Sequence, residues 1–559
     1  MVLAVMSNTG RILFPRRQPH KVPTTVASFD SEVCVAKTKK EEIEKLSAAL
    51  LAAMDAPVPV NPTCKISKSK FMAGVQCVKR EYMQVRHPEL AVNADDGRMQ
   101  QGLEVGSLAR RMFPGGVGVA ADYKHLPDAI RTTRELIANR EVPAIFEATF
   151  EHSGVLVRTD VLTRNGTGFH LTEVKSSTKI KPEHTDDVSV QKYVMGGCGL
   201  RVEETNVMHL SRDYVYDGAV GADGRRVYDI SRLFATEELQ PQSDGQVSRT
   251  LDEQFRVLAQ PQPPNIAPSS RCTSPYDCEF YDHCHPAWPD GDIRSLPIAG
   301  CKIEALRDAG IRLIDQLPGL IALLECFHLT KKECKFALGA KEKGVQINPA
   351  LVAELGALRY PLYFMDFETI FPALPLFAGL RPYQQIPFQW SVHVLREPGA
   401  EVEHHEFLAT DTNDPRREFI TSLCAVMGEI GNIVVYNETF ESQRLSELTS
   451  WPPGFAGRIG NIQGRLWDLL PRMRKHVYHP AFAGSYSLKY VLPALVPGMT
   501  YEGMAVGNGT EAGVAWESLV RGGWSEAERQ QKRKELLDYC GQDTLALVTL
   551  LRTLLDRAS

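Results

Sequence analysis

The sequence predicts an α/β protein with more than one domain. Its 559 residues are more than one ordinary hydrophobic core holds. A strand-rich block over residues 143–177 precedes a helical pattern over residues 185–196. A second hydrophobic strand, Leu362 to Met365, opens another region of strands and helices that extends to the C-terminus. Two α/β units in sequence are therefore expected.

Four segments are expected along the chain. They are a poorly ordered or loosely docked extension over residues 1–60, a first α/β domain over 61–290, a helical connector over 291–355 and a second α/β domain over 356–559. Residues 236–270 are rich in Pro, Gln and Ser and are expected to form a loop or linker. In the connector, the turn Asp308-Ala-Gly310-Ile between two short helices resembles a helix-hairpin-helix, which can present backbone amides to a DNA phosphate. A plain helical connector is the alternative.

The composition is that of a globular protein. The hydrophobic fraction is 43%, and no apolar run approaches the roughly 20 residues of a membrane helix. Residues 1–19 lack the apolar run of a secretory signal, so we expect a cytoplasmic protein without a membrane partner. A net charge of −5 argues against nonspecific coating of nucleic acid but is compatible with acidic metal sites. Twelve cysteines in such a chain suggest thiols and a metal site, not disulfides.

A first group of polar residues lies in the strand block. Glu173 and Lys175 are two residues apart in a strand, so they share a face. Asp160, from the preceding strand, can join Glu173 in holding a divalent cation through oxygen ligands. Lys175 can then orient or help to deprotonate an attacking water. The alternative is an exposed Glu/Lys pair on an edge strand.

The order Asp160…Glu173-x-Lys175 resembles the PD-(D/E)xK nucleases, in particular their RecB-like branch. Gln191, in the helix that follows, matches the Gln-containing helical motif of that branch. The resemblance implies a RecB-like, restriction-endonuclease-like α/β/α domain in which these four residues are catalytic and the two carboxylates bind metal. One departure is that the first helix lacks the metal-binding His of many relatives, with Glu104 as a candidate substitute.

Three cysteines at intervals of six residues follow this block, namely Cys272, Cys278 and Cys284. Zinc sites usually use pairs at closer spacing, whereas iron–sulfur clusters accept varied spacing of four thiolates. Cys77 stands where RecB-like iron–sulfur nucleases carry a lone cysteine before the core, and this resemblance implies a structural [4Fe–4S] cluster on the four. The alternatives are unligated thiols, zinc with His283 or His285, and Cys64 in place of Cys77. The other cysteines, Cys540 among them, are expected to be ordinary thiols.

A second acidic group begins where the strand at Leu362 ends. Asp366 and Glu368 are two residues apart and face one side, where two like charges are costly unless a cation neutralises them. Glu441 follows a buried-type strand and a turn. Tyr539 and Asp543 are four residues apart in a helical pattern and share one face. The alternative for any single carboxylate is a solvated surface charge.

This ordered set resembles the DEDD exonucleases of the ribonuclease H-like superfamily, in the subgroup with Tyr four residues before the last Asp. Glu441 departs from the usual Asp. The resemblance implies a mixed-sheet domain that binds two Mg²⁺ or Mn²⁺ ions, with Tyr539 orienting the water. The implied metal ligands are Asp366, Glu368, Glu441 and Asp543. Asp468 is a supporting or alternative ligand, and Lys489 is placed to meet a phosphate.

The order of both halves resembles a largely uncharacterised bacterial family that fuses a RecB-like nuclease to such an exonuclease domain. The expected function is therefore hydrolysis of phosphodiester bonds in DNA, with RNA as the less favoured substrate and 3′–5′ removal of nucleotides at the C-terminal site. DNA repair is one of several pathways compatible with this. The rival hypotheses are a nucleic-acid-binding adaptor with degenerate sites and a role in RNA processing.

Overall fold

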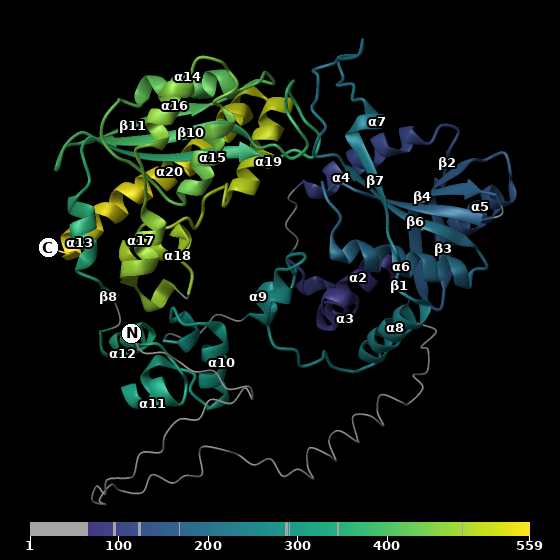
Figure 1. Cartoon of the computed structure of the whole chain (residues 1–559), viewed down its shortest axis with the longest axis horizontal. Coiled ribbons are helices and arrows are strands. Elements are labelled where there is room, and N and C mark those ends of the chain that lie inside the picture. The colour runs from purple at the N-terminus through teal and green to yellow at the C-terminus, as the bar shows by residue number, and fades with distance from the viewer. Residues whose placement is uncertain are drawn as a thin grey trace, which may run out of the picture. The chain divides into compact units, whose positions relative to one another are not determined.

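The structure is a computed structural model that describes residues 65–558, apart from 93–96, 121–124, 167, 286–288, 290, 344–345 and 483. The predicted extension over residues 1–60 and Cys64 lie outside the described residues. The described chain is a mixed α/β protein with two mixed sheets and many helices (Figure 1). Within it, no helix has both the length and the apolar character needed to cross a membrane.

The first sheet has seven strands in the order β2-β3-β4-β5-β6-β7, with β1 paired to β4. Its strands are β1 (Ile66–Ser67), β2 (Val117–Gly118), β3 (Ala144–His152), β4 (Val155–Asn165), β5 (Gly168–Lys175), β6 (Val202–Leu210) and β7 (Phe234–Glu238). Strands β3, β4 and β5 form an antiparallel meander, which confirms the predicted strand block. Strand β6 is parallel to β5, because the crossover helix α6 (Pro182–Gly197) returns the chain to the same edge.

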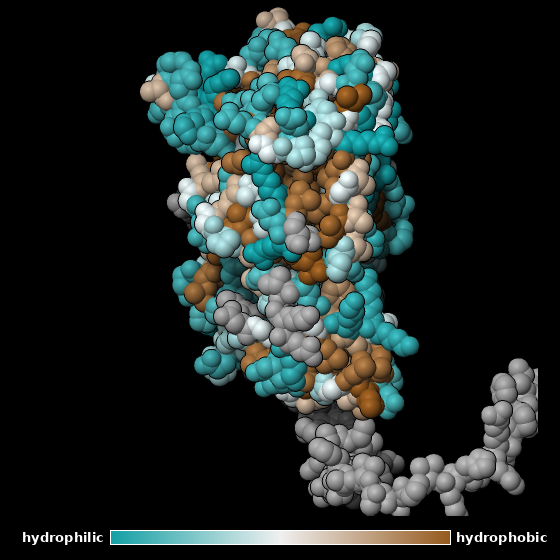
Figure 2. All heavy atoms as spheres, turned by 90° about the vertical axis from the view of Figure 1, so that its left-hand side faces the viewer, coloured by the Kyte–Doolittle hydropathy of each residue, from teal (hydrophilic) through white to brown (hydrophobic). Residues whose placement is uncertain are grey.

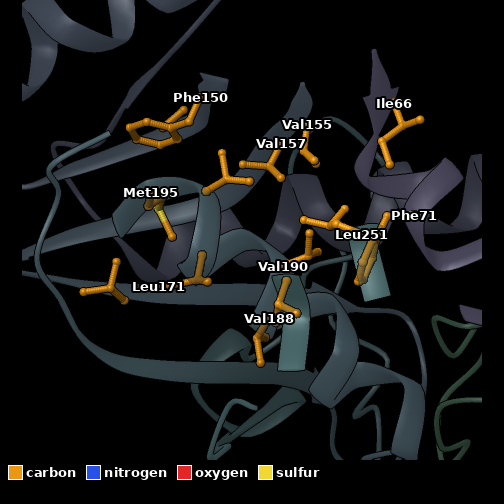
Figure 3. Packing of buried hydrophobic residues seen from close by; sticks show 14 of the residues in the cluster. Ile66, Phe71, Phe150, Val155, Val157, Leu171, Val188, Val190, Met195 and Leu251 are labelled. Carbon is orange, nitrogen blue, oxygen red and sulfur yellow. The ribbon is translucent and has the colours of Figure 1, made fainter. Parts of the chain in front are cut away.

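Four further helices in the described part of the chain bury one apolar core with this sheet and α6. They are α2 (Lys68–Gln76), α3 (Val78–Arg86), α5 (Leu126–Ala138) and α8 (Asp244–Leu258), whereas α4 (Arg98–Ala109) packs in a separate cluster with β6. Figure 3 shows Val155 and Val157 of β4, Val190 of α6, Phe71 of α2 and Leu251 of α8 gathered in this core. Full burial of side chains of this size stabilises the fold by roughly 1.5–3 kcal/mol each. The helix α2 is thereby held firmly against the sheet.

Cys77 separates α2 from α3, because it has the extended angles φ −163° and ψ 114°. One sequence expectation for this region is wrong. Residues 236–270 are not simply a linker, since they contain α8. Ser243 and Gln246 form a capping box at its start, and its apolar residues recur on one buried face. The Pro, Gln and Ser residues that suggested a linker cluster outside that helix.

The connector over residues 291–355 is largely helical, with a small hydrophobic cluster of its own. Its helices are α10 (Gly300–Asp308), α11 (Leu320–Glu325), α12 (Lys331–Lys343) and α13 (Ala350–Gly356), with a 3-10 turn η5 (Ile314–Gln316). The turn at Gly310, where φ is 83°, leads into η5 and not into a second α-helix. The predicted helix-hairpin-helix is therefore incomplete. Figure 2 shows hydrophobic residues reaching the surface among hydrophilic ones, several of them side by side.

The second sheet has five strands in the order β11-β10-β9-β12-β13. They are β9 (Leu362–Ile370), β10 (Ile386–Leu395), β11 (Val402–Leu408), β12 (Ile433–Val435) and β13 (Leu466–Asp468). The central β9 is antiparallel to β10 and parallel to β12. A separate two-stranded sheet pairs β8 (Gln346–Ile347) with β14 (Val477–Tyr478).

Helices cover both faces of the second sheet. They are α14 (Arg416–Val426), α15 (Glu438–Glu447), α16 (Ala456–Gln463), α17 (Leu469–His476), α18 (Leu488–Leu495), α19 (Gly509–Arg521) and α20 (Glu526–Ala558). Because strand side chains alternate, Phe364 packs in a cluster with Leu547 of α20, whereas Met365 packs in the cluster with Phe419 of α14. The long helix α20 thus lies on one face of β9 and β10. Strand β9 continues beyond the expected end at Met365, so Asp366 and Glu368 lie within the strand and not after it.

Replacing Leu251 with Ala tests the assignment of α8. Leu251 is 3% exposed, so the substitution leaves a cavity and is expected to lower the free energy of unfolding by about 2–5 kcal/mol. The matched control is Asp252→Ala on the exposed side of the same helix, with an expected change of about 0.5 kcal/mol or less. Urea unfolding followed by circular dichroism measures both. Equal, small effects would contradict the packing of α8 in the core.

Candidate functional sites

The most acidic candidate site lies on the face of β9 that meets α20. Phe367 packs with Phe419 of α14 on the other face of β9. The flanking Asp366 and Glu368 therefore project together toward α20. The Sγ atom of Cys540 lies 4.0 Å from Oδ2 of Asp366. Ligand atoms of Asp366, Glu368 and Cys540 all lie within 4.8 Å of one another, which is a spacing that one metal ion can bridge. We call this group, with Glu441, Tyr539 and Asp543, the β9 centre.

The other predicted residues reach the β9 centre from two helices. Glu441 stands in the first turn of α15 and is 1% exposed, and its Oε2 atom has no hydrogen-bond partner. Tyr539 and Asp543 lie one turn apart on α20 and line the same cavity as Asp366. Tyr501, which the sequence did not single out, donates a hydrogen bond of 2.5 Å to Oδ1 of Asp543. The interpretation of these carboxylates as solvated surface charges is wrong for Glu368 and Glu441, which are buried.

The buried carboxylates raise one another's pKa. Burial, followed by the charges of Asp543 and Glu368, holds the pKa of Asp366 well above its usual value. Burial, then Asp543 and Glu441, does the same for the pKa of Glu368. Burial raises the pKa of Glu441 to about 8 and that of Asp543 to about 6. At neutral pH the four groups cannot all be ionised at low cost unless a cation joins them.

A cavity of about 540 Å³ adjoins the β9 centre, and cationic side chains line part of it. Asp366, Tyr539 and Asp543 line it on the acidic side. Arg474 of α17 and Lys489 of α18 line it as well, so the predicted position of Lys489 beside the site is correct. A cavity with carboxylates at one side and cationic side chains at another suits a phosphodiester, whose oxygens need both a metal ion and hydrogen-bond donors.

Asp468 has a positioning role, and its role as a supporting or alternative ligand stays a prediction. Its Oδ1 atom accepts hydrogen bonds of 3.0 Å from the backbone N–H groups of Asn437 and Leu470. Its Oδ2 atom accepts another, also 3.0 Å, from the N–H of Glu438. Asp468 therefore caps α17 and fixes the turn at Asn437, where φ is 89°. This turn starts α15 and places Glu441 at the β9 centre.

A second candidate site lies on β5, and we call it the β5 centre. Strand β5 runs between β4 and β6, and Glu173 is 3% exposed, so the alternative of an exposed pair on an edge strand is wrong. The Nζ atom of Lys175 lies 2.8 Å from Oε1 of Glu173, as expected for residues that share a face. Asp160 lies on the neighbouring strand, and its Oδ2 atom accepts a hydrogen bond of 2.7 Å from the N–H of Val174.

Three further side chains complete the β5 centre. Gln191 is fully buried and donates from Nε2 to Oε2 of Glu173 at 2.9 Å and to Oδ1 of Asp187 at 2.8 Å. The sequence reasoning missed Asp187, although it lies one helical turn before Gln191. It also missed Lys68 of α2, whose Nζ atom lies 2.7 Å from Oε1 of Glu173 and 3.1 Å from Oδ1 of Asp187. No local pattern signals Lys68, which is 105 residues from Glu173.

Ion pairing sets the charges of the β5 centre. Burial alone would raise the pKa of Asp187, but Lys68 and Lys175 outweigh it and hold that pKa well below its usual range. Burial alone would lower the pKa of Lys68, but Glu173 and Asp187 keep it above its usual value. Burial and the charge of Glu173 raise the pKa of Asp160 to about 7. The centre thus holds two ammonium groups against its carboxylates, unlike the β9 centre.

The suggested substitute ligand on the first helix, Glu104, is wrong. Its side chain is exposed, and it lines a different cavity together with Arg226 and Trp516. The amide of Gln100 donates to it at 3.2 Å within α4. The β5 centre instead receives Lys68 from α2.

The four predicted cysteine ligands line a single cavity of about 370 Å³, and they are Cys77, Cys272, Cys278 and Cys284. Each is a free thiol with partial exposure. Cys77 reaches the cavity from the break between α2 and α3, and the N–H of Cys278 donates to the carbonyl of Cys272 at 2.9 Å. Among the described residues that line this cavity there is no histidine, and His285 stacks on Tyr281. The zinc alternative with His285 thus receives no support.

Comparison with known proteins finds a family domain whose residues include part of the β9 centre. Residues 363–487 match the family described as a domain of unknown function, DUF2779, so the chain carries a DUF2779 domain. This stretch includes Asp366, Glu368 and Glu441 and ends before Tyr539 and Asp543.

Two individual proteins are similar to this chain. The uncharacterized protein UU173 of Ureaplasma parvum serovar 3 is 22% identical over an alignment of 242 residues, and the match covers 39% of this chain. The match spans 35% of UU173, or about a third of that relative's length. A solved structure titled "Crystal structure of SSO0001" is 15% identical, covering 44% of this chain and 96% of its own, with a TM-score of 0.23. At that score the likeness carries no argument about fold or function.

Divalent ions are expected to stabilise the chain through the β9 centre. A carboxyl whose pKa is higher in the folded state binds more protons when folded, so the free energy of unfolding falls as pH rises. For Glu441 this fall extends from pH 4.5 to about 8. Mg²⁺ or Mn²⁺ at about 100 times its Kd should restore about 2.7 kcal/mol, with a larger gain at the upper end of that range. Thermal unfolding with and without the ion measures the gain.

The Asp366→Asn and Ser243→Ala variants are the matched pair for this test. Asp366→Asn removes a repelled charge, so it should stabilise the metal-free chain and abolish the gain from metal. Ser243→Ala, at the start of α8 in the first domain, should lower stability by about 0.5–2 kcal/mol through the lost cap and keep the gain. A gain that survives Asp366→Asn would contradict metal binding at the β9 centre.

Proposed function

We propose that the chain is a metal-dependent nuclease whose main reaction centre is the β9 centre. The observation that carries this proposal is one mutually repelling group of carboxylates, the buried Glu368 and Glu441 with the half-buried Asp366 and Asp543, beside a cavity lined by Arg474 and Lys489. Acidic groups that neutralise one another only through cations, next to donors for phosphate oxygens, suit phosphodiester hydrolysis. This supports a ribonuclease H-like domain of the DEDD type over residues 356–559.

The donor set of the β9 centre fits Mg²⁺ or Mn²⁺. Carboxylate oxygens are the ligands these ions prefer, and Oε2 of the buried Glu441 has no other partner. We assign Asp366, Glu368, Glu441 and Asp543 as the ligands. Ions bound there would supply Lewis-acid stabilisation of the phosphodiester and a water that ionises near neutral pH.

The chain's own side chains orient the substrate in this proposal. Burial and the charges of Asp543 and Glu368 keep the pKa of Tyr539 well above its usual value, so its phenol stays protonated and can orient the attacking water. Lys489 and Arg474 donate to non-bridging phosphate oxygens in the adjoining cavity. The hydrogen bond from Tyr501 holds the carboxylate of Asp543 in one orientation. Removal of nucleotides from a 3′ end, with DNA as the favoured substrate, is the corresponding reaction.

The β5 centre supports a second, RecB-like nuclease site less strongly. Asp160 and Glu173 provide the expected oxygens, and Lys175 and Gln191 contact Glu173 as such a site requires. However, both oxygens of Glu173 already accept from Lys68, Lys175 or Gln191. This observation also favours the second candidate function, in which the first domain, over residues 61–290, binds nucleic acid without cleaving it.

We also propose that the cysteine cavity holds a [4Fe–4S] cluster. Four thiols around one cavity supply the complete ligand set of such a cluster. Cys77 precedes β5 in the chain and the other three follow it, so a cluster would link the two ends of the first domain. We place the protein in the cytoplasm, where thiols stay reduced, with nucleic acid as its partner and DNA repair among the compatible pathways.

Cleavage of end-labelled single-stranded DNA and RNA with Mg²⁺ or Mn²⁺ tests the nuclease proposal. Asp366→Ala is expected to reduce cleavage from the 3′ end by about 10²-fold or more, because the ion loses a ligand. Lys175→Ala should leave that reaction unchanged and affect only cleavage at the β5 centre. Absence of cleavage by the wild-type chain with every ion and substrate would contradict the proposal, and loss with Lys175→Ala alone would move the reaction to β5.

Iron and acid-labile sulfide analysis of anaerobically purified protein tests the cluster. About four of each per chain, with a brown colour, are expected. Cys278→Ser should reduce the iron content and lower thermal stability, whereas Cys326→Ser, at an exposed thiol outside the cavity, should change neither. Zinc in place of iron, or equal iron in both variants, would contradict the assignment.

A further inference from the structure

The β5 centre contains a lysine, Lys68, to which the proposed function gives no role. Its side chain is 22% exposed, and its Nζ atom contacts the two most buried carboxylates of the centre, Glu173 at 2.7 Å and Asp187 at 3.1 Å. The side chains of Glu173 and Asp187 are only 4% and 6% exposed. An ammonium group that reaches two such carboxylates is part of the centre and not a surface charge.

Helix α2 fixes where Lys68 stands. Lys68 is the first residue of α2, and Ser67 caps the helix by accepting from the N–H of Lys70. Phe71, one turn later, is buried in the core, and its carbonyl accepts a hydrogen bond of 3.0 Å from the buried Gln254 of α8. At its other end α2 stops at Cys77, which lines the cysteine cavity. The position of Lys68 is thus set by packing and not by its ion pairs alone.

Both lysines converge on one oxygen atom. Oε1 of Glu173 lies 2.7 Å from Nζ of Lys68 and 2.8 Å from Nζ of Lys175, and Gln191 donates to Oε2. A divalent cation that used Glu173 as a ligand would have to displace or share these donors, and it would stand close to two positive charges. Coulomb repulsion at such distances is strong wherever water is excluded.

We propose that Lys68 is an intrinsic cation of the β5 centre that competes with a divalent metal ion for the carboxylate of Glu173. In this role Lys68 is a positioning residue that acts through Glu173. It holds Glu173 and Asp187 in place when no metal is bound. Because it competes with the ion, a higher metal concentration is needed to fill this centre. The β9 centre contains no lysine in contact with its carboxylates among the described residues, so the two centres should differ in metal affinity.

This inference rests on the proposed function only in taking Glu173 as a metal ligand. The test therefore measures metal binding without nucleic acid. If Lys68 controls metal affinity but no variant cleaves DNA or RNA, only the nuclease proposal fails. If the wild-type chain cleaves but Lys68 has no effect on metal affinity, only this inference fails.

Mn²⁺ binding to the full chain, followed by the electron paramagnetic resonance signal of the free ion, tests the proposal. Every variant carries Asp366→Asn and Asp543→Asn, so that ions at the β9 centre are not counted. In this background Lys68→Met should bind Mn²⁺ about tenfold more tightly or better, since the competing charge is gone. Lys68→Arg keeps the charge and should bind as weakly as the background chain. Lys65→Met is the matched control, because Lys65 is exposed and pairs with Glu151.

Two further variants keep the test decisive. Lys68→Gln removes the charge but keeps a hydrogen-bond donor, so it replaces Lys68→Met if thermal unfolding shows that Lys68→Met does not fold. Adding Glu173→Gln to the neutral variant should abolish the gain in affinity. The proposal is overturned if neither neutral variant binds Mn²⁺ more tightly than the background chain, if Lys68→Arg gains as much as they do, or if the gain survives Glu173→Gln.

Discussion

The mutual repulsion of the carboxylates grouped on β9 is the constraint on which the rest of the second sheet depends. Asp366 and Glu368 project from the central strand into a face covered by α20, where burial weakens their screening by water. Asp468 accepts two backbone hydrogen bonds from the turn that brings Glu441 to the group, and a third from the start of α17. At neutral pH such a group is stabilised by protonation of some of its members or by a bound cation, and the bound cation is what we propose for the β9 centre.

The two centres differ in the groups that contact their carboxylates. At β5, Lys68 and Lys175 neutralise Glu173 and Asp187, so this group is stable without an added ion. At β9, the residues in contact with the carboxylates are a phenol, Tyr501, and a thiol, Cys540, neither of which brings positive charge. We therefore regard the β9 centre as the primary metal site and the β5 centre as one whose metal affinity is restrained by its own lysines.

The sequence could predict those pairs of site residues that lie two or four positions apart in one strand or helix. The pairs Asp366/Glu368 and Tyr539/Asp543 follow from the repeats of a strand and a helix, and both lie as those repeats require. Lys68 and Tyr501 could not be found in this way, because their partners are 105 and 42 residues away along the chain and only tertiary packing brings them together. The helix α8 was missed because its composition was averaged with the Pro-rich residues around it.

Paired Mn²⁺ ions are the most direct test of the central claim, which is that the β9 carboxylates are held together by cations. Two ions sharing such ligands lie about 3.5–4 Å apart and couple magnetically. Electron paramagnetic resonance of the wild-type chain with Mn²⁺ should therefore show a spin-coupled pair that Asp366→Asn removes and Lys175→Ala leaves intact. A wild-type chain that shows no coupled pair and no bound ion sensitive to Asp366→Asn would contradict the account.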